Sequence, residues 1–133
     1  MKIEKNFVTA TGKRKASIAK ALILKGTGKI IVNEKSISSY FSSVTNEYKK
    51  IKICLNLVNL ANHLNIVLFV KGGGVSSQLD AICLSIAKAL CKINPVHRSL
   101  FNNFLFLRSD SRIKERRKYG LKKARKASQY SKR

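Results

Sequence analysis

The sequence is most informative in what it has little of. Its 133 residues include no tryptophan, one proline, three cysteines and six acidic residues, against 28 lysines and arginines. The shortage of acids leaves a net charge of +22, which indicates a polyanionic partner. The chain has neither a run of about 20 apolar residues nor an apolar face beside its charges, so a membrane is not expected. Nucleic acid is the predicted partner.

The three cysteines do not form a metal or cofactor motif. Cys54, Cys83 and Cys91 show no C-x-x-C spacing and have no paired histidines nearby, so we expect no metal and no cofactor. Cys83 and Cys91 lie in an apolar pattern and are expected to be buried free thiols. Free thiols favour a reducing compartment. The first 15 residues lack the hydrophobic core of a signal peptide and are too short for a transit peptide. We therefore expect the protein to act where it is made.

Catalytic patterns are also missing. No pair of acids, no Ser/His/Asp set and no Cys/His pair occurs in a recognisable context, so no enzyme and no small-molecule substrate are predicted. The stretch Gly26–Lys29 resembles a phosphate-binding loop only superficially, because its glycine spacing is wrong and Ile30 stands where Ser or Thr should follow the lysine. A small-molecule phosphotransferase is the enzymatic alternative, and the absent catalytic acids argue against it.

The last 26 residues, 108–133, concentrate the charge. They hold twelve Lys or Arg residues and two acids, with Ile113, Leu121 and two alanines as their only aliphatic side chains. Such a segment cannot bury enough surface to offset its ordering entropy, so we expect it to be disordered without an anionic partner. Fully extended, it would reach about 85 Å. We predict a globular domain over residues 1–107, which itself carries +12, and a basic tail over 108–133.

The globular part predicts an α+β fold. Strands are expected over 7–11, 17–24, 29–33 and 65–71, with a helical turn over 36–41 whose aromatic residues pack inward. The apolar run 66–70 is unbroken, which predicts a central strand buried on both faces. Apolar residues from Leu79 to Leu90 follow a helical stripe that Asn94 and Pro95 end, and a shorter helix is expected to reach Asn103. Residues 44–63 stay ambiguous: alternation over 51–57 suggests a strand, and 58–61 suggest the start of a helix.

Two short motifs in this domain are candidates for RNA contact. The basic triplet Lys13, Arg14 and Lys15 is either a solvated turn or a phosphate-binding knuckle, and the overall charge favours RNA. Lys71 precedes three glycines, Gly72–Gly74, between a strand and a helix. These glycines either leave backbone amides free for a phosphate or permit a tight turn with close helix packing.

Two tyrosines stand among the cations of the tail. Tyr119 and Tyr130 either stack on bases or pin the tail against the domain. Both interpretations fit the sequence equally well.

Three segments together resemble a known family. These are residues 7–41 (FVTATGKRKASIAKALILKGTGKIIVNEKSISSYF), 72–90 (GGGVSSQLDAICLSIAKAL) and 112–133 (RIKERRKYGLKKARKASQYSKR). They resemble the ninth small-subunit ribosomal protein of bacteria and organelles, nearly from end to end. The resemblance implies a single α+β domain with a left-handed β-α-β unit, like the second domain of ribosomal protein S-five, plus a long basic extended C-terminal tail.

The resemblance also implies partners. These would be small-subunit rRNA in the head, neighbouring head proteins and the anticodon stem-loop of the peptidyl-site tRNA. The residues assigned to rRNA are Lys13, Arg14, Lys15, Lys71, Gly72, Gly73, Gly74, Arg108, Arg112, Lys114, Arg116, Arg117, Lys118, Tyr119, Lys122, Lys123, Arg125 and Lys126. Those assigned to tRNA are Gln129, Tyr130, Ser131, Lys132 and Arg133.

The expected setting is the ribosome of a plastid, since the composition is compatible with an AT-rich genome. A mitochondrion or a bacterial cytoplasm is the alternative. A free-standing basic RNA-binding protein or RNA chaperone is the functional alternative to a structural ribosomal protein.

Overall fold

Nine secondary-structure elements make up the described body of the protein. The computed structural model describes residues 7–42 and 48–131. The strands are β1 (Phe7–Arg14), β2 (Ser17–Lys25), β3 (Ile30–Val32), β4 (Lys35–Ser36) and β5 (Leu64–Lys71). The helices are α1 (Ile37–Tyr40), α2 (Lys49–Asn56), α3 (Val75–Ile93) and α4 (His97–Asn103). The predicted α+β class is confirmed.

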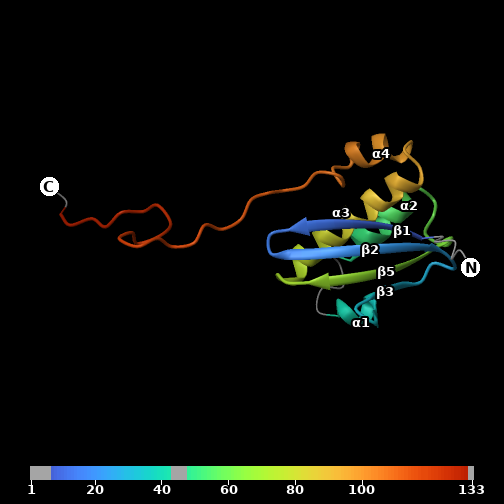
Figure 1. Ribbon diagram of the computed structural model, residues 1–133, viewed down its shortest axis with the longest axis horizontal. Helices are drawn as coiled ribbons and strands as arrows, with labels where there is room; N and C mark the ends of the chain where they lie inside the picture. Colours follow the sequence, from blue (N-terminus) through green and yellow to red (C-terminus); the bar gives the residue numbers. More distant parts are fainter. Residues whose placement is uncertain (1–6, 43–47, 132–133) are drawn as a thin grey trace, which may run out of the picture.

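The five strands form one sheet in the order β1-β2-β5-β3-β4. Strands β3 and β5 run parallel, and the other neighbouring pairs are antiparallel. A parallel pair needs a crossover connection, and the chain between β3 and β5 contains α1 and α2. Figure 1 shows α2 and α3 on one side of the sheet.

Strand β5 is central, as predicted, but it is not buried on both faces. Leu64, Ile66, Leu68 and Val70 point into the core, whereas Phe69 on the opposite face is 55% exposed. The apolar run concealed the alternation, because the outward side chains are apolar as well. Helices cover one face of this sheet only, so the period of two decides which residues are buried.

Helix α3 supplies most of the core that faces the sheet. Its stripe of Leu79, Ile82, Ile86 and Leu90 is fully or almost fully buried, and the helix packs on β1, β2 and β5. The approach to β1 is very close at Gly12, where a Cβ atom would lie 2.1 Å from the Ala81 carbonyl oxygen. A glycine is therefore required at this crossing.

The ambiguous region contains helix α2, so both sequence-based interpretations of it were wrong where the structure describes it. Ile51, Cys54 and Leu55 are buried at a helical spacing of i, i+3 and i+4, which places one side of α2 against α3. The alternation over 51–57 came from an amphipathic helix of only eight residues, and 57–63 form turns rather than a second helix. Residues 44–47 of this prediction lie outside the described residues.

The first strand is longer than predicted. It continues through Arg14, so Lys13 and Arg14 belong to β1 and only Lys15 and Ala16 form the turn into β2.

The short α1 matches the predicted helical turn: Phe41 beside it is fully buried, and its ring lies 4.9 Å from that of Tyr40. Helix α4 ends at Asn103, as predicted.

The described part of the chain contains no helix long and apolar enough to cross a membrane. In the same residues no cluster of three or more His, Cys, Asp or Glu side chains is arranged to hold a metal ion.

The cysteines are free thiols, as predicted, but they differ in burial. Cys54 and Cys83 are buried in the core, whereas Cys91 is only half-buried. Burial raises the pKa of the Cys83 thiol to about 12 and raises the pKa of Cys54 further. Both thiols are therefore protonated and unreactive at neutral pH.

Partial burial raises the pKa of the Cys91 thiol as well, but of the three cysteines only this one reaches the surface. We therefore predict that iodoacetamide at mildly alkaline pH modifies Cys91 alone in the native protein. Mass spectrometry of the alkylated chain measures the modification. In guanidinium chloride, which exposes the core, all three cysteines should react. Modification of Cys54 under native conditions would show that α2 does not pack as described.

Candidate nucleic-acid interface

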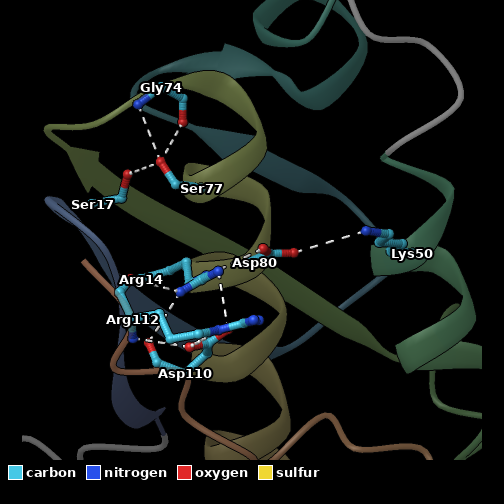
Figure 2. Close-up of polar contacts among 8 residues, drawn as sticks. All are labelled: Arg14, Ser17, Lys50, Gly74, Ser77, Asp80, Asp110 and Arg112. Atoms are coloured by element: carbon cyan, nitrogen blue, oxygen red, sulfur yellow. Dashed lines mark hydrogen bonds and ion pairs between the residues drawn. The ribbon is translucent and has the colours of Figure 1, made fainter. Parts of the chain in front are cut away.

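One end of the sheet brings together the two motifs that the sequence predicted for RNA contact. The β1–β2 turn and the end of β5 lie side by side there, since Ile18 pairs with Lys71. The hydroxyl of Ser17, which follows the turn, lies 2.9 Å from the Gly72 carbonyl oxygen and 2.7 Å from the Ser77 hydroxyl of α3. The β1–β2 turn and the glycine turn therefore lie next to each other at this end of the sheet, and Figure 2 shows the contacts of Ser17 and Gly74 with Ser77 there.

The glycine turn is shaped by packing at its middle residue. Gly73 has a φ of +68°, and a Cβ atom there would lie 2.0 Å from the Ser17 hydroxyl. Ser77 closes the turn, since its hydroxyl accepts a hydrogen bond from the Gly74 amide at 3.1 Å (Figure 2). At Gly74, in contrast, a Cβ atom would meet nothing within 4 Å. The tight-turn interpretation thus explains Gly73, while Gly74 leaves an open approach to the start of α3.

Three lysines surround this turn and face solvent. Lys13, Lys15 and Lys71 are all exposed. None of them takes part in an ion pair with another residue of the described ranges 7–42 and 48–131. Clustered cations without a protein partner repel one another, so an anion at this end of the sheet is favoured.

Arg14 differs from its two neighbours because it turns inward. Its side chain is only 16% exposed, and it forms ion pairs with Asp110 at 3.0 Å and with Asp80 of α3 at 3.8 Å. It also donates to the backbone carbonyl oxygens of Asp110 and Arg112, at 3.2 and 3.3 Å. One guanidinium therefore joins β1, α3 and the first residues of the tail, as Figure 2 shows. We call this cluster the tail clasp.

Asp110 is the centre of the tail clasp. Its carboxylate accepts hydrogen bonds from the side chain and backbone amide of Arg112, and these bonds hold the pKa of Asp110 well below its usual range. An aspartate in the unfolded chain has a pKa of about 3.9. The lowered pKa in the folded protein means that the clasp is at full strength above that value and weakens as the pH falls below it.

Acidic residues are concentrated around the base of the tail. Asp80 also pairs with Lys50 of α2 at 3.8 Å, and Glu115 pairs with Arg125 at 2.6 Å. Of the six acids in the chain, three therefore serve to attach the tail or to shape it. These three negative charges are paired with cations of the protein itself.

The tail itself contains no helix and no strand over residues 108–131, and Figure 1 shows it extending away from the body. A small loop interrupts it, in which Leu121 bridges to Ala127 and the Lys122 amide donates to the Lys126 carbonyl oxygen at 2.8 Å. Tyr119 and Tyr130 are fully exposed. They do not pin the tail against the domain, and stacking on bases stays a prediction.

The predicted site residues fall into three places. Lys13, Lys15, Lys71 and Gly72–Gly74 lie at the end of the sheet, and Arg14 lies beneath them in the tail clasp with Arg112. The others lie along the tail: Arg108, Lys114, Arg116, Arg117, Lys118, Tyr119, Lys122, Lys123, Arg125, Lys126, Gln129, Tyr130 and Ser131. Lys132 and Arg133 lie outside the described residues.

Sequence reasoning missed the acidic half of the tail clasp. Asp80 lies near the start of α3, where a carboxylate is favourable without any further partner, and Lys50 falls in the ambiguous region. The closeness of Asp110 to Arg112 was a usable signal, since a carboxylate two residues before an arginine can bond to it locally. Nothing in the sequence indicated the third partner, Arg14, which is 96 residues away from Asp110.

We predict that Arg14→Gln releases the start of the tail without unfolding the body. Asp80 keeps Lys50 and Asp110 keeps Arg112, so neither carboxylate is left unpaired, and the unfolding free energy should fall by only about 1 kcal/mol. The amides of residues 109–113 should gain fast motion, measured by ¹⁵N relaxation. Lys15→Gln removes the same charge from a solvated side chain and serves as the control. Equal relaxation in the two variants would show that the clasp does not hold the tail.

Comparison with known proteins identifies the family. The family model described as "Ribosomal protein S9/S16" matches residues 12–133. The protein named small ribosomal subunit protein uS9c of Thalassiosira pseudonana is 48% identical over 122 residues, which cover 92% of this chain and 91% of that protein. The uS9c protein of Cyanidium caldarium is 47% identical over 93% of this chain and 97% of its own length.

A bacterial relative is similar to nearly the same degree. Small ribosomal subunit protein uS9 of Synechocystis is 44% identical over 92% of this chain and 90% of its own length. Several highly similar relatives are plastid-type uS9c proteins of algae, so the predicted plastid ribosome is confirmed as the setting. The family is a structural, non-enzymatic part of the ribosome, in agreement with the predicted lack of catalysis. The chain belongs to the S9/S16 family of ribosomal proteins, and to its bacterial and organellar type.

Proposed function

We propose that this constituent of the small ribosomal subunit binds small-subunit rRNA in the head and extends its tail to the peptidyl-site tRNA. The observation that carries this proposal is the contrast between the ends of the molecule. The body is anchored by a packed core, whereas the tail has no core of its own and leaves the body as an extended chain (Figure 1). An extended cationic chain is suited to lie along phosphates that the body cannot reach.

In this proposal the body uses Lys13, Lys15 and Lys71 to contact phosphates. All three are exposed around the glycine turn, where Gly74 leaves room for a backbone to approach the start of α3. Contacts of this kind fix the position of the protein and read little sequence. Arg14 acts differently from the other residues of the triplet: it holds the tail to the body and thereby sets the point from which the tail departs.

The tail contributes a second set of phosphate contacts. Its basic residues from Lys114 to Lys126 face solvent for the most part, and the pair of Arg125 with Glu115 is itself largely exposed. Such an exposed pair is weak and can be exchanged for a phosphate. The last residues, 129–133, would then reach the anticodon stem-loop of the tRNA, and neighbouring head proteins would surround the body.

Two finer points accompany this proposal. Residues 1–107 would fold as one domain with 108–133 as its tail, and the crossover between β3 and β5 would be left-handed, as the family resemblance implies. Both stay predictions. A free-standing RNA chaperone is the competing function, and no contact among the described residues favours it.

We predict that replacing Lys13, Lys15 and Lys71 together by alanine lowers the salt dependence of binding to small-subunit rRNA. Each lost phosphate contact should reduce the slope of log K against log salt by roughly 0.7–0.9, hence by about two to three for the triple variant. Filter binding at several salt concentrations measures the slope. The matched control replaces Lys25, Lys29 and Lys88, which are also exposed but distant from the glycine turn. If both variants change the slope equally, the end of the sheet has no special role.

We predict that deleting residues 131–133 weakens tRNA binding but not assembly. The deletion removes two of the tail's twelve cations, so most of the rRNA contacts survive. Charged hydrogen bonds to tRNA phosphates are worth about 1.5–3 kcal/mol each when desolvated, and less where water screens them. Purified subunits carrying the truncated protein should show full occupancy and faster dissociation of peptidyl-site tRNA. Wild-type dissociation from fully occupied subunits would exclude a tRNA contact by the tail tip.

A further inference from the structure

The sheet has a second surface, which shares only Lys13 and Lys71 with the contacts proposed so far. It is the face of β1, β2 and β5 opposite α3, and among the described residues Figure 1 shows no helix in front of these strands. We call it the open face. Its side chains are Phe7, Thr9, Thr11 and Lys13 of β1, Ile18, Lys20, Leu22 and Leu24 of β2, and Asn65, Val67, Phe69 and Lys71 of β5.

An aromatic ring stands on the central strand of this face. Phe69 is 55% exposed, although it lies on the strand that has neighbours on both sides. Its register partner is Lys20, and Lys71 follows two residues later on the same face. A shallow hollow of about 390 Å³ lies beside the ring, lined by Thr11, Ile18, Lys20, Asn33, Phe69, Val70 and Lys71. The ring is thus accessible from the side as well as from above.

The sheet carries charge of one sign only. Its five strands contain six lysines and arginines and not a single acid. On the open face, Lys13, Lys20 and Lys71 lie at the end nearest the glycine turn. A partner that covers this surface must carry negative charge to neutralise these lysines. It must also pack against apolar side chains, one of them aromatic.

Unpaired RNA satisfies both requirements. Its bases stack on aromatic side chains that a sheet presents, and its phosphates can pair with lysines beside the ring. A basic segment of this chain, such as the tail, would meet repulsion there. A neutral protein surface would bury the lysines without a counter-charge, which is costly.

We propose that the open face binds an unpaired nucleotide of rRNA, with its base stacked on Phe69 and the adjoining phosphates on Lys20 and Lys71. The inference rests on the proposed function in one respect, namely that the partner is RNA. It adds a base-stacking contact on Phe69 beside the phosphate contact already proposed for Lys71.

The absence of tryptophan from the chain permits a direct test. Phe69→Trp places a single fluorescent indole on the open face. Phe104→Trp is the matched control, because Phe104 is also 55% exposed but lies at the end of α4. Both full-length variants are titrated with a single-stranded oligouridine and with an RNA duplex, and binding is measured separately by filter retention. We expect the single strand to quench the indole of the Phe69→Trp variant strongly and the duplex to quench it little. The Phe104→Trp variant should respond weakly to both.

A second variant tests the contribution to affinity. Phe69→Leu keeps an apolar side chain at an exposed position, so the fold should persist. We expect it to weaken binding of the oligouridine by about five-fold or more while leaving the salt slope unchanged, because stacking releases no counterions. Ultraviolet irradiation of purified subunits should link the peptide that contains Phe69 to rRNA.

The outcomes separate the two proposals. If the protein retains the oligouridine but the two tryptophan variants are quenched equally, the stacking site is wrong and the proposed function stands. If neither RNA is retained, the proposed function fails, and the stacking site fails with it. A crosslink from the Phe69 peptide to a neighbouring protein would show that a protein covers the open face and would overturn the inference.

Discussion

The guanidinium of Arg14 is the contact on which the arrangement of this protein depends. It lies at the end of β1, beneath the exposed turn, and bonds at once to the side chain of Asp80 and to the side chain and backbone of Asp110. Without this junction, the basic tail of 26 residues would have no fixed direction relative to the body, which is itself cationic. The tail clasp gives the tail a defined starting point beside the glycine turn.

A protein of net charge +22 has few acids, and the clasp shows where two of them are used. Asp80 and Asp110 neutralise the basic residue of the triplet that is turned inward, and Glu115 shapes the tail through Arg125. These acids act where chain segments must meet. Elsewhere the cations are left for an external polyanion, so folding and RNA binding make complementary use of the same charges.

The sheet connects these surfaces. Its inner face holds the core against α3, with Gly12 allowing the helix to approach β1 closely. Its end carries the turn with Lys15 and the glycine turn, which Ser17 and Ser77 hold together. Its open face carries Phe69 and lysines. A rigid sheet of this kind can present separate RNA-facing surfaces in fixed relation, while the tail extends beyond them.

Local pattern was sufficient for much of this protein. Strands β1, β2, β3 and β5 and the long helix α3 follow from periodicity, because burial on one side acts on neighbouring residues, whereas the two-residue β4 was not predicted. The same reasoning failed for α2, where a helix of two turns is too short for its period to be distinguished from alternation. It also failed for the outer face of β5, since apolar side chains there conceal which face is buried.

Only the tertiary structure decided what the individual charges do. Lys13, Arg14 and Lys15 are nearly equivalent in sequence, yet one lies in a cluster of carboxylates and two face solvent. That difference arises because alternate strand residues point to opposite faces and because α3 and residue 110 meet the inner one. The sequence by itself determined that the protein is cationic, mixed α and β, and built to bind a polyanion. Which cations hold the protein together and which remain for RNA depends on contacts between residues 96 positions apart, and no local pattern encodes them.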